Sequence, residues 1–178
     1  MDSKIYDELK KIFGSSCFSD ELFDAFNYTI KNRIYSLELY QLLLWNKSIS
    51  KDEVLLYAFK ICSVYPAIAY DINILVAGIF EACSGCGDDY MTALFYYKKA
   101  ISIKPEDAKA YVAAAGLYHN DLKIPPFDIL VNLLTEGLEK VTEKSVLYYA
   151  LAALYNKSGN SNLMRKFREM GDAAAVKE

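Results

Sequence analysis

With 178 residues, of which 53% are hydrophobic and 24% charged, the chain has the composition of a packed globular protein, which excludes a disordered chain. Its length suits one domain, so we expect a single all-helical domain over residues 1–178. The formal net charge of −3 argues against nucleic acid as a partner, because binding to phosphate groups depends on clustered Lys and Arg.

The amino terminus and the apolar runs indicate the cellular location of the protein. Residues 1–8 contain no apolar stretch of the kind that a secretory signal needs. The most apolar run, residues 72–80, includes Asn73 and is far shorter than the roughly 20 residues that span a bilayer. We therefore expect a cytoplasmic protein that does not associate with membranes and whose cysteines remain thiols.

Apolar residues recur at intervals of three and four along the chain, which predicts one helix after another and no strand. The pattern indicates about ten helices joined by short turns, as in stacked helical hairpins. They are expected at about residues 3–13, 34–45, 51–64, 66–84, 90–103, 105–118, 127–141, 143–157 and 160–174, with one more that follows Ser19 as its cap.

Several of these boundaries have explicit signals. Gly14 suits the left-handed conformation that follows a helix. Ser50 and Glu53 have the spacing of a capping box, in which each side chain bonds to the other residue's main-chain amide. Pro66 ends the preceding helix. Residues 105–107, Pro-Glu-Asp, are expected to open the helix that reaches residue 118.

Small and aromatic residues alternate at fixed intervals in the second half of the chain. One helix carries the order Ala, aromatic, Ala and Pro, at Ala93, Tyr97, Ala100 and Pro105. The next carries Tyr111, Ala114, Ala115 and Tyr118, and a later one repeats this frame as Tyr148, Leu151, Ala152 and Tyr155, with Gly159 at the turn. Tyr111 and Tyr148 are 37 residues apart, against a repeat of about 34, and extra loop residues at 124–126 explain the difference.

This pattern resembles the tetratricopeptide repeat family over residues 74–170, and more weakly over residues 35–66. The resemblance implies an α-solenoid of stacked antiparallel hairpins wound into a right-handed superhelix. It divides the chain into a cap or diverged hairpin (1–33), a degenerate repeat (34–66), two repeats (67–105 and 106–142) and a C-terminal repeat or cap (143–174). A generic helical bundle and related superhelical arrays are the alternatives.

In that family, the first helix of each hairpin lines a concave groove that binds a peptide or a helix. The matching positions here are mostly small and apolar: Leu75, Gly78, Ala82, Lys109, Val112, Gly116, His119, Val146, Tyr149, Ala153 and Asn156. Of the side chains with which the family clamps a terminal carboxylate, only Lys109 agrees. An apolar groove suits either a hydrophobic partner segment or the protein's own amino-terminal helices folded back over it.

The residues that could carry chemistry are few. Cys83 and Cys86 have the spacing of a redox dithiol, but they follow a helix, whose dipole would raise the thiol pKa, and no strand precedes them. As a zinc site they lack a second pair of ligands, since only Cys17, Cys62 and His119 remain. His119, the single histidine, adjoins a helix end, where a capping or surface role is typical.

The sequence therefore favours a non-enzymatic module that binds another protein or a peptide segment, as an adaptor or a partner-specific chaperone, with no cofactor or metal. Self-association stays open, because three or so repeats form a short stack. The alternative from another class is a thiol- or metal-dependent enzyme that uses Cys83 and Cys86. Replacing both cysteines by Ser should leave fold and binding intact under the first hypothesis and abolish an activity under the second.

Overall fold

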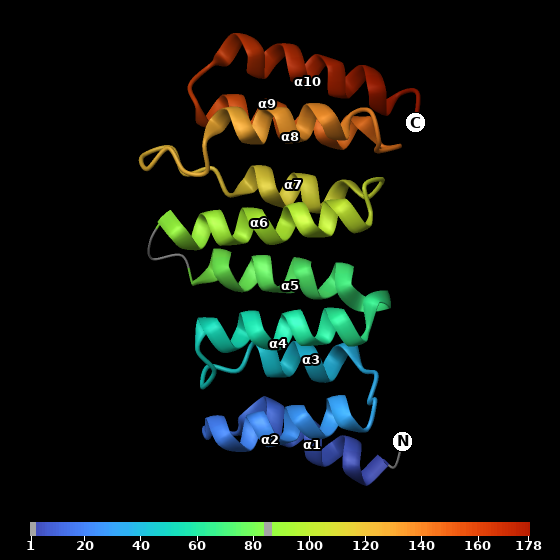
Figure 1. Cartoon of the computed structure of the whole chain (residues 1–178). Coiled ribbons are helices and arrows are strands. Elements are labelled where there is room, and N and C mark those ends of the chain that lie inside the picture. The colour runs from blue at the N-terminus through green and yellow to red at the C-terminus, as the bar shows by residue number, and fades with distance from the viewer. Residues whose placement is uncertain (1–2, 84–86) are drawn as a thin grey trace. The chain divides into compact units, whose positions relative to one another are not determined.

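The computed structural model describes residues 3–83 and 87–178. Over these residues the protein contains ten α-helices, one short 3-10 helix and no β-strand, which confirms the all-helical prediction (Figure 1). None of the described helices has the length and apolar character needed to cross a bilayer. The elements are α1 (Ser3–Ser15), α2 (Ser19–Lys31), α3 (Leu37–Leu44), α4 (Lys51–Val64), η1 (Pro66–Ile68), α5 (Ala69–Ala82), α6 (Gly87–Ile103), α7 (Ala108–Gly116), α8 (Phe127–Gly137), α9 (Lys144–Lys157) and α10 (Ser161–Ala175).

Side-chain caps set the start of several helices. The predicted capping box at α4 is confirmed: Ser50 accepts a hydrogen bond from the amide of Glu53, whose carboxylate accepts one from the amide of Ser50 at 2.6 Å. The carboxylate of Glu53 also accepts from the hydroxyl of Ser19 at 2.7 Å. These hydrogen bonds lower the pKa of Glu53, and the bond from the main-chain amide of Ser50 contributes most. Gly159, at φ +80°, makes the predicted turn between α9 and α10.

Two of the predicted helix starts are wrong. Ser19 does not cap α2 but is its first residue, because the side chain donates to Glu53 and the N-cap position falls to Phe18. Pro105 does not open α7. Asp107 caps that helix by accepting from the amide of Lys109 at 2.9 Å, so that α7 begins three residues after the proline. In both places a nearby hydrogen-bonding group competes with the local signal.

The described chain divides into two compact units, one ending at Val76 and one beginning at Ala77. The division falls inside α5. The single domain and the repeat boundaries expected from the sequence therefore remain predictions.

In the first unit, α1 packs against both α2 and α3, and α3 packs against α4. Every one of these helices contributes side chains that are almost entirely inaccessible to solvent. They include Phe13, Leu22, Leu39, Tyr40, Leu43, Leu44, Tyr57 and Ile61. Asn46, just after α3, donates to the carbonyls of Phe13 and Ser16 at 2.9 and 3.1 Å, which ties the end of α1 to the end of α3.

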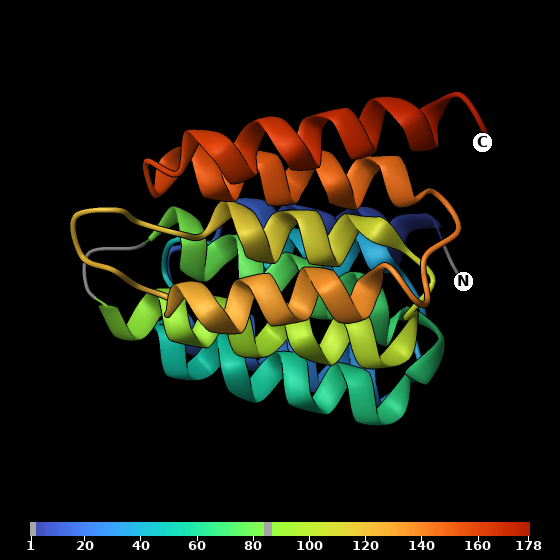
Figure 2. The ribbon, with the colours of Figure 1, turned by 90° about the horizontal axis from the view of Figure 1, so that it is seen from above.

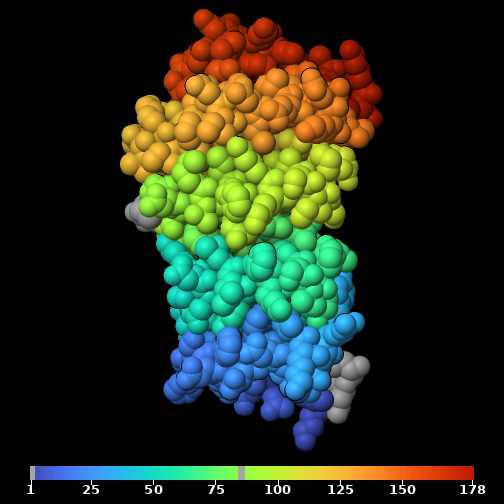
Figure 3. Space-filling view, in the orientation of Figure 1, coloured from blue at the N-terminus to red at the C-terminus, as the bar shows by residue number. Residues whose placement is uncertain are grey.

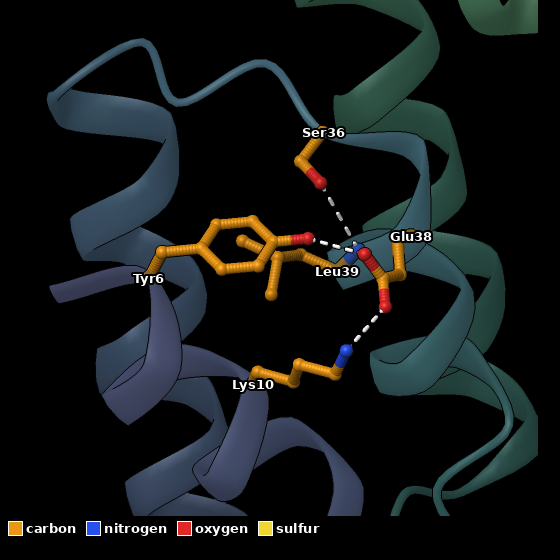
Figure 4. A network of polar contacts seen from close by, with 5 residues as sticks. All are labelled: Tyr6, Lys10, Ser36, Glu38 and Leu39. Atoms are coloured by element: carbon orange, nitrogen blue, oxygen red, sulfur yellow. Dashed lines mark hydrogen bonds and ion pairs between the residues drawn. The ribbon is translucent and has the colours of Figure 1, made fainter. Parts of the chain in front are cut away.

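A polar network at the surface holds α1 to the start of α3 (Figure 4). The carboxylate of Glu38 accepts hydrogen bonds from Tyr6 and, at 2.5 Å, from Lys10, both on α1. These hydrogen bonds lower the pKa of Glu38, and the bond from Lys10 contributes most. The contact between Lys10 and Glu38 also raises the pKa of Lys10. Beside them, Ser36 caps α3 by accepting from the amide of Leu39 at 3.3 Å. The charge of Lys10 is thus directed toward α3.

In the second unit, each helix from α6 onward packs against the next, and α7 also packs against α9. Small residues make these close approaches possible. Ala93, Ala100, Ala110 and Ala114 are fully buried. At Gly137, a Cβ atom would lie only 2.9 Å from Tyr111 and from Leu147, so that this glycine lets α8 approach α7 and α9 closely. The small-and-aromatic pattern noticed in the sequence thus consists largely of core contacts.

Aromatic rings connect the segments that contain the last four helices. Tyr118 meets Phe127 with ring centroids 5.4 Å apart, and Phe127 meets Tyr155 at 5.3 Å, both edge to face. Tyr155 in turn stacks on Phe167 of α10 at 5.3 Å. Figure 2 shows α10 running alongside α9. In the space-filling view of Figure 3, the red atoms of α10 lie directly on the orange atoms of the residues that precede it. The last of these ring contacts, between Tyr155 and Phe167, joins α10 to α9.

Candidate functional site

The first candidate surface is the face of α7 and α9 predicted to bind a partner. On α7, Lys109 and Gly116 are exposed and Val112 is half-buried, whereas Ala110, Tyr111, Ala114 and Ala115 on the other side of the helix are buried. A Cβ atom at Gly116 would meet nothing within 4 Å. The predicted positions therefore form one accessible stripe along α7, opposite its core face.

On α9 the predicted positions are also outside the core. Val146 is half-buried and Tyr149, Ala153 and Asn156 are exposed. Because α7 and α9 pack against each other, the structure brings the two stripes onto neighbouring helices. Lys157 strengthens this arrangement, since its ammonium group donates to the carbonyl of Gly116 at 2.9 Å and so binds the end of α9 to the end of α7.

Tyr149 differs from the others because α10 engages it. Its hydroxyl donates to Asp172 at 2.9 Å, and this bond raises the pKa of Tyr149. A Cβ atom at Gly171 would lie 2.8 Å from the ring, so the glycine lets α10 approach it closely. Glu178 adds a further link by accepting from the amide of Ser145 at 3.0 Å and from its hydroxyl at 2.5 Å, which lowers the pKa of Glu178. Tyr149 thus has a structural contact within the chain.

The remaining predicted positions lie at helix ends or on another helix. His119 follows α7, where its main-chain amide donates to Ile124 at 2.8 Å and its Nδ1 atom accepts from the amide of Leu122 at 3.3 Å. This contact lies in the loop that follows α7, whereas the C-cap of α7 is Leu117, so His119 does not cap the helix. On α5, Leu75 and Gly78 are half-buried and Ala82 is exposed, and the division into two units falls between Leu75 and Gly78.

The cysteine hypothesis falls partly outside the described residues. Cys83 is exposed and follows α5 directly, as expected, but Cys86 lies outside the described ranges, so the pair as such is not described. Cys17, Cys62 and Cys83 form no disulfide with one another. Over residues 3–83 and 87–178, no three His, Cys, Asp or Glu side chains are grouped closely enough to hold a metal ion.

Two hollows in the surface were not predicted from the sequence. One, of about 850 Å³, lies between α6 and α8, and its wall includes Lys98, Ile129 and Lys140. The other, of about 770 Å³, lies between α1 and α2. The recurrence of apolar residues at intervals of three and four was visible in the sequence of α1, but only the pairing of α1 with α2 places these residues beside the acidic residues of α2.

Comparison with known proteins gives no relative: no family model matches the chain, and no curated protein sequence does.

Proposed function

We propose that this protein is a non-enzymatic binding module of tetratricopeptide-like hairpins, which holds a peptide or helix of a partner protein on the face of α7 and α9. The observation that carries the proposal is the accessible stripe on each of these two packed helices. Lys109, Val112 and Gly116 on α7 recur at the same spacing as Val146, Tyr149 and Ala153 on α9. Matched stripes on adjacent helices are the arrangement that helix-in-groove recognition uses.

The composition of the stripes supports a segment with small apolar side chains as the ligand. Val112 and Val146 offer half-buried apolar surface, and Gly116 and Ala153 let a bound chain approach the helices closely. Lys109 adds a cation at one end. Since α10 already engages Tyr149, the proposed contact surface on α9 consists of Val146, Ala153 and Asn156.

The proposal is tested with a displayed library of peptides of about 12–20 residues, a length that covers the two to three turns of the stripes. Peptides enriched on the wild-type protein are then measured by fluorescence anisotropy against Ala153→Glu, which places a bulky charge on the face. The matched control is Ala173→Glu, the same change at an exposed alanine of α10. We expect Ala153→Glu to weaken binding by about tenfold or more, the effect of burying an unpaired charge, and the control to change it by less than about twofold.

Enrichment of no peptide, or peptides that bind Ala153→Glu as tightly as the wild type, would refute this function. Circular dichroism of both variants checks that each retains its helical content.

A further inference from the structure

The open groove between α1 and α2 has an apolar floor. Ile5, Leu9 and Ile12 of α1 line it, with Leu9 buried and the two isoleucines half-buried. At its ends, Phe18 is 73% exposed and Tyr28 is 42% exposed, large values for aromatic rings. This apolar surface lies wholly within the first unit, whereas the face of α7 and α9 belongs to the second unit.

Carboxylates line the same groove. Glu8 on α1 and Asp20, Glu21 and Asp24 on α2 belong to its wall, whereas none of its lining residues is Lys or Arg. Glu21 accepts a hydrogen bond from the hydroxyl of Ser16, which holds its charge at the groove. Four negative charges beside an apolar floor make this a strongly acidic part of the surface.

The nearby cations do not line the groove. Lys10 is paired with Glu38 on the α3 side of α1, as Figure 4 shows. Lys4 and Lys11 are carried by α1 and Lys31 by the last turn of α2, and none of them is among the lining residues. The groove therefore keeps an excess of negative charge next to its apolar floor.

We propose that this groove docks an amphipathic helix of a partner protein, one that carries Lys or Arg on both sides of its apolar stripe. The apolar floor runs along about two turns of α1, from Ile5 to Ile12, so it can meet the apolar residues i, i+4 and i+7 of a bound helix. The charges select a basic ligand, since an acidic segment or an anionic lipid surface would be repelled. This site goes beyond the proposed function, because it lies in the other unit and admits a different class of ligand.

The test uses three labelled helical peptides of about 16 residues with Leu at positions i, i+3, i+4 and i+7. The flanking positions are Lys in the first peptide, Glu in the second and Gln in the third. With the full chain, anisotropy is expected to show that the Lys peptide binds at least about tenfold more tightly than the Glu peptide. Raising the salt from about 0.05 to 0.5 M should remove most of that difference, because mobile ions screen exposed charges.

Two variants locate the binding. Phe18→Ser removes the exposed ring from the groove, and Glu8→Gln with Asp24→Asn removes two of its charges. Each should weaken binding of the Lys peptide by about fivefold or more, since both the apolar and the charged contacts contribute. The matched control, Glu139→Gln with Asp121→Asn, makes the same change of charge at exposed positions in the second unit and should leave binding unchanged.

The proposal is overturned if the Lys peptide does not bind, if the Glu peptide binds equally well, or if the groove variants bind the Lys peptide like the wild type. It is also overturned if sedimentation shows a dimer that Phe18→Ser dissociates, because a second copy then occupies the groove. The variant Ala153→Glu should leave binding of the Lys peptide intact, so that this proposal and the proposed function fail or hold separately.

Discussion

Replacing Gly137 by Ala tests how closely the helices of the second unit must approach. Gly137 is the last residue of α8, and its added Cβ atom would lie 2.9 Å from Leu147 and from the ring of Tyr111. Both neighbours are buried, Leu147 completely and Tyr111 to 1% exposure, so neither can turn toward solvent to make room. The added methyl group must therefore push α8 away from α7 and α9 or force a strained rotamer.

The size of the effect follows from two opposing contributions. Overpacking of a well-packed core costs about 1–3 kcal/mol. Alanine is favoured over glycine inside a helix by up to about 1 kcal/mol, and by less at its last residue. The clash is the larger contribution, so we expect Gly137→Ala to lower the free energy of unfolding by about 1–2 kcal/mol.

Gly116→Ala is the matched control, because Gly116 is also the last residue of its helix but its Cβ atom would meet nothing within 4 Å. This variant should be as stable as the wild type or slightly more stable. Urea unfolding followed by circular dichroism measures both, with the slope of the transition checked for a change in cooperativity. Equal stability of the two variants would show that the crossing at Gly137 has room for a methyl group, and would refute the reasoning.

The remaining predictions concern buried hydroxyls, acid and the C-terminal helix. Tyr57→Phe should stabilise the protein by about 1 kcal/mol, because the buried hydroxyl of Tyr57 has no hydrogen-bond partner among the described residues. Tyr40→Phe should destabilise the protein by a similar amount, because the variant loses a 2.7 Å hydrogen bond to a main-chain carbonyl. Urea midpoints that rank the two variants in the reverse order would contradict this prediction. Because the pKa of Glu53 is lowered in the folded protein, Glu53 contributes stability above its ordinary pKa of 4.5, and this stability is lost as the pH falls through the folded-state pKa. Between pH 6 and 3, the urea midpoint of the wild type should therefore fall more than that of Glu53→Gln. Parallel curves of urea midpoint against pH for the two proteins would exclude this contribution. Tyr149→Ala should speed amide hydrogen exchange in α10 with little change in α7, whereas unchanged exchange in α10 would mean that the ring does not secure that helix.

Local patterns in the sequence predicted the helices because the signals act over a few residues. The spacing of apolar residues and the capping pair Ser50 and Glu53 gave α4 the bounds that the structure has. At Ser19 the prediction was wrong because a distant group intervened. Ser19 lost its capping role to a hydrogen bond with Glu53, which lies 34 residues further along the chain. No window of sequence around Ser19 contains that partner.

The candidate sites also combine features that could be predicted from the sequence with features that depend on contacts between helices. The positions on α7 and α9 were predicted from the resemblance to the tetratricopeptide repeat. They form stripes because residues three, four and seven apart share a face of a helix whatever surrounds it. The engagement of Tyr149 by α10 could not be predicted, since it depends on Gly171 facing the ring from another helix. The acidic groove likewise combines Ile5 and Glu8 of α1 with Asp24 of α2, which meet only after the two helices pair.

The sequence by itself determined that this chain forms helices, where most of them begin and end, and which of their residues are apolar, because these properties follow from neighbours a turn or two away. Only the tertiary structure decided which helices lie together, and hence which small residues, such as Gly137, sit at crossings and which carboxylates share a groove. Packing of side chains depends on partners far apart in the sequence, and a periodic pattern does not specify them.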